Sequence, residues 1–187
     1  MIALEDEGAT LGENLKGIII VAAREYAREV LGMEKTRELL KNSGLGDKTI
    51  LATKDYPNQL GFAFITLVGN ERGLSMLEAV QEGAAYFAKT YAPKNYRAFY
   101  LLNRDLAKAL ANFQKICSIA LEGQEIGNYA AIEVRRTGDN SFRIRYDSPL
   151  QNTAYPKGLV QGLSEHYQTP VHISDISNTE FEVKLAE

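Results

Sequence analysis

A change of sequence pattern near Gly123 places the strongest constraint on how this 187-residue chain can fold. Before Gly123, apolar residues recur at spacings of three and four, which is the period of amphipathic helices. After it, apolar and polar residues alternate over short segments, as they do in half-buried strands. This order predicts an α+β fold, with an N-terminal extension over 1–14 and then a single domain whose helical part covers 15–122 and whose sheet part covers 123–187.

Five segments of the helical part are expected to be helices. They cover residues 15–30, 33–41, 60–68, 75–91 and 103–121. The third is apolar enough for a buried strand, but its helical neighbours favour a helix. Ser75 and Glu78 have the spacing of a capping box, and Pro93 is expected to end the helix that they begin. Residues 49–54 are expected to be extended, and Tyr56-Pro57 to form a turn.

The sheet part is expected to contain two hairpins with a helix between them. The expected strands cover residues 130–136, 141–148, 171–177 and 180–185. Thr137-Gly138-Asp139-Asn140 has the residues that a tight hairpin turn needs, and the helix covers 156–167. Together the strands predict an antiparallel sheet of about four strands. Phe142, Ile144 and Tyr146 alternate with charged residues, so these three side chains are expected to face the core.

The composition argues against several classes of protein. A net charge of −3 gives no general reason to expect a nucleic-acid partner. Cys117 is the only cysteine, which fits a reducing cytoplasm, and the spacing of His166 and His172 matches no metal motif. The apolar runs are too short for a membrane span or a secretory signal. Without a Ser-His-Asp order or a phosphate loop, the chain is expected to be cytoplasmic and not an enzyme.

Three short segments resemble one family of sensory proteins. Leu15-Lys16-Gly17-Ile18-Ile19 is similar to the family's opening residues, and Tyr146-Asp147-Ser148-Pro149 is similar to the first part of its Tyr-x-Ser-x-Arg motif. Residues 158–167 resemble the helix that follows this motif. Their order and spacing over 15–185 make the chain resemble the H-NOX family, the haem-based nitric oxide and oxygen sensors related to soluble guanylate cyclase, and imply that family's fold.

The resemblance also implies which positions would bind haem. In the family a helical histidine binds the iron, and the Tyr, Ser and Arg of the motif hold the haem propionates. Tyr146 and Ser148 match, whereas Leu150 stands at the arginine position and Leu106 at the iron-ligand position. The first histidine of the chain is His166. Because leucine neither ligates iron nor balances a buried carboxylate, haem is not expected to bind in the family's manner.

The resemblance implies a signalling domain in which a bound small molecule shifts the helical part relative to the sheet, and a partner signalling protein detects the shift. We expect a pocket for a small apolar ligand other than haem. Its expected lining is Leu106, Leu110, Tyr146, Ser148 and Leu150. One alternative is a protein-interaction module whose pocket has closed, since the wider superfamily includes TRAPP subunits and vinyl-reductase-type domains. The other is a haem-based gas sensor with an atypical iron ligand, such as Cys117, a tyrosine or a terminal histidine.

Several of these residues also suit structural roles. Tyr146 and Ser148 fit a strand that packs on the core and a turn before a proline. Ala84, Ala85 and Ala88 form a small-residue patch that allows two helices to pack closely or leaves room for a flat ligand. The first hairpin carries four arginines, which either meet an anionic partner or form an exposed sheet face: Arg135, Arg136, Arg143 and Arg145.

Overall fold

The computed structural model describes residues 14–46, 49–114, 131–147 and 152–186. Its helices are α1 (Gly17–Leu31), α2 (Met33–Asn42), α3 (Asn58–Arg72), α4 (Met76–Tyr86), the π-helix η1 (Phe87–Tyr91), α5 (Ala92–Asn95), α6 (Arg97–Leu102), α7 (Leu106–Ala111) and α9 (Ala154–His166). Its strands are β1 (Asn14–Lys16), β2 (Asp55–Pro57), β3 (Ala131–Gly138), β4 (Ser141–Asp147), β5 (Val171–Ser177) and β6 (Glu180–Leu185). Helices precede the four-stranded sheet, so the predicted α+β fold is confirmed.

The sheet is antiparallel, with the strand order β3-β4-β6-β5. Both predicted hairpins are present, and β4 pairs with β6 to join them. Phe142 and Ile144 on β4 are buried, whereas Arg143 and Arg145, which alternate with them, are exposed, as the pattern predicts. The two arginines of β3 are exposed as well, so the arginines of this hairpin lie outside the core.

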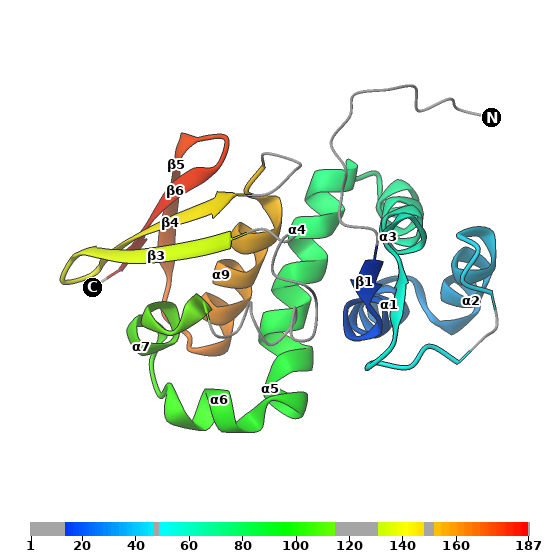
Figure 1. The fold of residues 1–187 in the computed structure, drawn as a ribbon, viewed down its shortest axis with the longest axis horizontal. Coiled ribbons are helices and arrows are strands. Elements are labelled where there is room, and N and C mark those ends of the chain that lie inside the picture. Colours follow the sequence, from blue (N-terminus) through cyan, green and yellow to red (C-terminus); the bar gives the residue numbers. More distant parts are fainter. Residues whose placement is uncertain (1–13, 47–48, 115–130, 148–151, 187) are drawn as a thin grey trace.

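Two hydrophobic cores lie side by side, and α4 runs between the sheet and the helices α1–α3 (Figure 1). The sheet-side core forms where α7 and α9 pack against the sheet. Its buried side chains include Leu106, Leu110, Phe113, Phe142, Ile144, Leu159, Leu163 and Phe181. The helical core lies among α1–α4 and includes Ile20, Tyr26, Leu39, Phe64 and Val68. Because α4 gives Ala84 to the first and Ala79 to the second, this helix belongs to both cores.

A partly buried hydrogen-bond network fixes α4 against the helices on its other side. The Tyr26 hydroxyl on α1 donates to Glu82 Oε2 on α4 at 2.6 Å. Arg72 at the end of α3 donates to the same hydroxyl oxygen at 2.7 Å and also contacts the Glu82 carboxylate. Burial raises the pKa of Tyr26, so its phenol stays a neutral donor. Three helices therefore meet at one satisfied polar group.

The apolar segment 60–68 is helical, as its surroundings predict, and lies within α3. Phe64 and Val68 are fully buried in the helical core. The helix ends at Gly73, whose φ of 70° is left-handed and favours glycine. Neither α3 nor any other helix in the described part of the chain is long and apolar enough to cross a membrane.

The start of α1 differs from the prediction because residues 49–54 fold over it. They form no strand; instead the carbonyls of Lys54 and Ala52 accept hydrogen bonds from the Gly17 and Ile18 N–H groups, at 2.8 and 2.9 Å. These are N–H groups that the first turn of a helix leaves without an intrahelical partner. The turn expected at Tyr56-Pro57 is wrong as well, since both residues belong to β2, which pairs with β1.

The helix over 75–91 begins as predicted, with Ser75 and Glu78 forming a complete capping box. Its predicted end at Pro93 is wrong. The last turn widens into η1, where the Ala92 N–H bonds the carbonyl of Phe87, and α5 then continues past Pro93. Proline lacks an N–H and removes one helical bond, and the wide turn directly before it lets the chain stay helical.

The helix expected over 103–121 begins later than predicted, at Leu106. The Asp105 carboxylate caps it by accepting from the Lys108 N–H at 2.8 Å, and α7 ends at Ala111. Residues 115–121, with Cys117, lie outside the described part of the chain. The short helix α6 was not predicted, because Leu101 and Leu102 are exposed and give it no amphipathic pattern.

Candidate functional site

Three of the five predicted site residues lie in or against the sheet-side core. Leu106 begins α7, and Leu110 follows one turn later; both side chains are buried. Tyr146 on β4 is half-buried and packs against the same core, with its ring centroid 6.4 Å from that of Tyr155. Ser148 and Leu150 lie outside the described residues. The fold therefore brings together residues 40 positions apart in the chain, at the junction of α7 with the sheet.

The surroundings of Leu106 and Leu110 are closely packed. The two leucines are 1% and 0% exposed, and Phe113, which follows α7, is also 0% exposed. Side chains from the sheet and α9 complete the packing with the same degree of burial, namely Phe142, Ile144, Leu159 and Leu163. A side chain without accessible surface has no water-sized space beside it. Two of the positions predicted to line a pocket, Leu106 and Leu110, thus lie in a filled core.

The small-residue patch on α4 and η1 packs closely against α9. A Cβ added to Gly158 on α9 would lie 2.1 Å from the carbonyl oxygen of Gln81, and one on Gly162 would lie 2.2 Å from that of Ala85. The side chains of Gln81 and Gln161 are joined by a hydrogen bond of 2.9 Å across this contact. Sequence reasoning singled out the alanines but missed the two glycines, whose spacing of four residues was the available signal.

The wide turn of the π-helix η1 leaves a backbone carbonyl that needs a hydrogen-bond donor from elsewhere. Because the Ala92 N–H bonds Phe87, the carbonyl of buried Ala88 loses its usual helical partner. The Tyr100 hydroxyl on α6 donates to that carbonyl at 2.6 Å. Burial raises the pKa of Tyr100, so the phenol stays protonated and keeps this bond.

Among the residues that the structure describes, few groups near α7 are suited to bind iron. His166, at the end of α9, has its ring centroid 4.7 Å from that of Tyr100, and the rings meet edge to face. The hydroxyl of Tyr167 donates to the carbonyl of Asn103. His172, the other histidine, is exposed on β5. Within the described ranges no cluster of three His, Cys, Asp or Glu side chains has the arrangement of a metal site.

Replacing Tyr100 by phenylalanine is expected to lower the free energy of unfolding by about 2 kcal/mol, since the buried Ala88 carbonyl then has no donor. Urea unfolding measures the change. Tyr56→Phe is the matched control: its hydroxyl accepts from the N–H of exposed Leu51 at 2.9 Å, and water can take its place. Equal losses in the two variants would contradict a role for Tyr100 in satisfying the π-turn.

Comparisons with known proteins give a consistent result. The sequence profile of the haem-NO-binding family (HNOB) matches residues 16–175. The fold matches an H-NOX protein from S. oneidensis in its Fe(II)NO state, with a TM-score of 0.80 and 17% identity over 92% of this chain and 100% of the other. It also matches an oxygen-binding H-NOX domain related to soluble guanylate cyclases, in its oxygen complex, with a TM-score of 0.79 and 17% identity over 92% of this chain and 96% of the other.

A further match is a mutant H-NOX from T. tengcongensis, with a TM-score of 0.79 and 16% identity, covering 92% of this chain and 98% of the other. No curated protein matches the sequence significantly. At such low identity the solved structures show a shared fold and not shared ligands. The family assignment depends on the profile match, which spans most of the chain and confirms the resemblance inferred from the sequence. The chain belongs to the haem-NO-binding family, the H-NOX domains.

Proposed function

We propose that this chain is a haem-independent signalling domain of the H-NOX family. The single observation that carries the proposal is the burial of Leu106 and Leu110, at 1% and 0% exposure, on the helix where the resemblance places the iron ligand. Apolar side chains from the sheet and α9 fill the space around them. The family's output is a signal to a partner protein, so we propose a cytoplasmic partner and no catalytic step for this domain.

The chemistry of the available donors supports this proposal. The chain has no histidine before His166, so no register of the alignment places an imidazole on α7. The phenols of Tyr100 and Tyr167 are already donating to backbone carbonyls. Leu150 at the motif's arginine position offers no guanidinium for a propionate. The residues at these positions therefore do not fit haem held in the family's manner.

Between the two haem-free alternatives, the packing favours a protein-interaction module. A ligand pocket lined by Leu106, Leu110, Tyr146, Ser148 and Leu150 requires the first two to separate from their neighbours. Of the three residues in this set that the structure describes, Tyr146 is half-buried, whereas Leu106 and Leu110 are buried. A small apolar ligand at this place remains the second candidate, and it would act by opening the sheet-side core.

The test is the absorbance spectrum of protein purified from haem-producing cells, recorded before and after haem is added and excess haem is removed by gel filtration. We expect no Soret band that stays with the protein, because leucine stands at the family's iron-ligand position and the chain has no histidine before His166. The H-NOX protein from S. oneidensis, handled in parallel, is the positive control. A stable Soret band at one haem per chain would overturn the proposal, and Cys117→Ala and Tyr100→Phe would then identify the iron ligand.

A further inference from the structure

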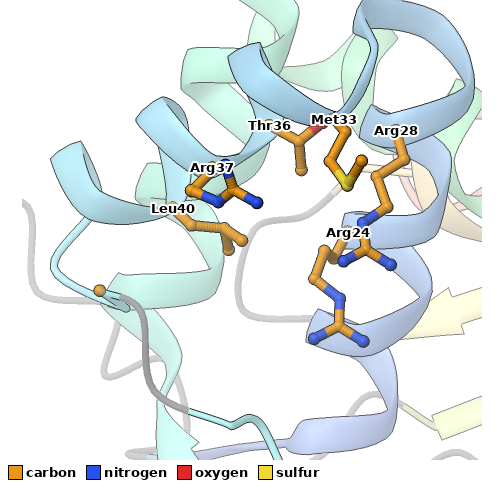
Figure 2. Close-up of a pocket in the computed structure, with 7 residues that line it drawn as sticks. Arg24, Arg28, Met33, Thr36, Arg37 and Leu40 are labelled. Carbon is orange, nitrogen blue, oxygen red and sulfur yellow. The ribbon is translucent and has the colours of Figure 1, made fainter.

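A small cleft lies between α1 and α2, in the helical end of the molecule and away from the sheet-side core. Figure 2 shows Arg24 and Arg28 from α1 on one side of it and Arg37 and Leu40 from α2 on the other. Its volume is about 140 Å³. The complete lining is Arg24, Arg28, Met33, Thr36, Arg37, Leu40 and Gly46.

The charges that line the cleft are all positive. Arg28 Nη1 and Arg24 Nη2 both contact a single oxygen of Glu25, at 3.0 and 3.4 Å. Arg37 pairs with Glu34 at 3.1 Å, but the Glu34 side chain is 86% exposed. An ion pair so open to water is weak. Each guanidinium has five N–H donors, so these two carboxylates leave most of the donor capacity of the three arginines for another acceptor.

One donor in the cleft wall is buried without an acceptor. The Nε atom of Arg24 is inaccessible to solvent and makes no hydrogen bond within the described part of the chain. Buried N–H groups nearly always have an acceptor, because leaving one unsatisfied costs free energy. Thr36 does not supply it, since its hydroxyl donates to the Gly32 carbonyl at 2.7 Å. Since no water-sized group reaches this atom, an oxyanion in the cleft would accept from it only after the Arg24 side chain turns.

We propose that the cleft binds a small organic anion through one carboxylate or phosphate group. Arginine pairs with such groups through two parallel hydrogen bonds, and Arg24 and Arg37 face the space from different helices. Met33 and Leu40 provide an apolar wall for a short carbon body. The volume is below that of pockets for drug-sized molecules, which limits the ligand to a few carbons.

This site is independent of the proposed function. Its lining residues belong to neither the packing around Leu106 nor the contact between α4 and α9. The anion would join α1 to α2 and stabilise the folded state by an amount that grows with the logarithm of its concentration once this exceeds the dissociation constant. Tyr26 on α1 is hydrogen-bonded to Glu82 on α4. The helix α1, which lines the cleft, therefore contacts α4 directly, and α4 belongs to both cores.

The methionine methyl groups allow a direct test on the whole protein. The chain has three methionines, of which Met33 lines the cleft and Met76 begins α4 outside it. Methyl-¹³C-methionine protein is titrated with inorganic phosphate, and separately with succinate, at an ionic strength held constant with sodium chloride. We expect the Met33 signal to shift and saturate in roughly the millimolar range with at least one of the two anions, while Met76 stays in place. If Met33 does not shift, or shifts without saturating and together with Met76, the proposal is overturned.

Two variants test whether the arginines hold the anion. Arg24→Gln combined with Arg37→Gln is expected to weaken the Met33 response at least tenfold. Arg145→Gln is the matched control, because this exposed arginine pairs with Asp147 on the sheet, far along the chain from the cleft. For both variants, an unchanged Met76 signal first shows that the protein is folded. If the Met33 titration of the double variant is unaltered, the assignment is overturned. If the titration is altered in the double variant and not in Arg145→Gln, the assignment is supported.

Discussion

Replacing Gly162 by alanine is expected to lower the free energy of unfolding by about 3 kcal/mol, at the upper end of what overpacking costs. The added Cβ would lie 2.2 Å from the carbonyl oxygen of Ala85 and 2.9 Å from the Cβ of Ala88. Neither atom is at the end of a flexible side chain that could turn away. The helices α4 and α9 must therefore move apart, which disturbs the sheet-side core that they both pack against.

Urea unfolding measures this loss, and Gly83→Ala is the matched control. Gly83 lies in the same helix pair, on α4, but its added Cβ would meet Ile65 Cδ1 at 3.5 Å, an ordinary contact. Alanine is the better helix former by about 0.5–1 kcal/mol, so this control is expected to be neutral or slightly stabilising. Gly158→Ala repeats the first result, with the Gln81 carbonyl oxygen at 2.1 Å. If Gly162→Ala were as stable as Gly83→Ala, the two helices would not be in close contact.

The contact between α4 and α9 also explains how a change in one part of the molecule would reach the other. α4 is bonded to α1 and α3 through the Tyr26 hydroxyl and packs directly on α9 beside the sheet. Lys89 on η1 and Glu165 on α9 add an ion pair at 2.7 Å at the surface of this contact, worth little by itself. A rigid contact of this kind transmits movement of whole helices better than a loosely packed one.

The sequence predicted those elements whose pattern lies within one segment. The alternation of Phe142 and Ile144 with arginines identified the hairpin, and Ser75 with Glu78 identified the start of α4, because both patterns are local. The errors arose where a distant segment decides the conformation. Residues 49–54 bond to the start of α1, and the turn before Pro93 is satisfied by Tyr100 from the next helix. The periodicity within either segment does not indicate these partners.

For the same reason the helical position of two candidate site residues could be predicted, but not their surroundings. Placing Leu106 and Leu110 on one face of a helix needed only their spacing, and both are buried on α7. Whether that face meets a pocket or a filled core depends on residues of the sheet and α9, which the spacing does not contain. The arginine cleft was missed because Arg24 and Arg28 are neighbours on α1 but Arg37 comes from α2, and only the packing of two helices brings them together.

The distinction between a filled core and a pocket can be measured by truncating Leu110. Leu110→Ala is expected to lower the free energy of unfolding by about 3–4 kcal/mol, the cost of deleting a fully buried leucine from a close-packed site. Leu101→Ala is the control; this leucine lies on neighbouring α6 and is 61% exposed, so its loss is expected to cost less than about 0.5 kcal/mol. Urea unfolding of the three proteins gives both values.

The size of the Leu110→Ala effect also decides between the two haem-free functions. A leucine that lines a ligand cavity lacks packing atoms on one side, so its truncation removes fewer contacts and costs less. A loss near 1 kcal/mol, close to that of Leu101→Ala, would therefore contradict the filled core and favour a pocket for an apolar ligand. A loss of 3 kcal/mol or more means that a ligand entering here must first overcome the packing of this core, and a domain of that kind is better suited to signal through its outer surface.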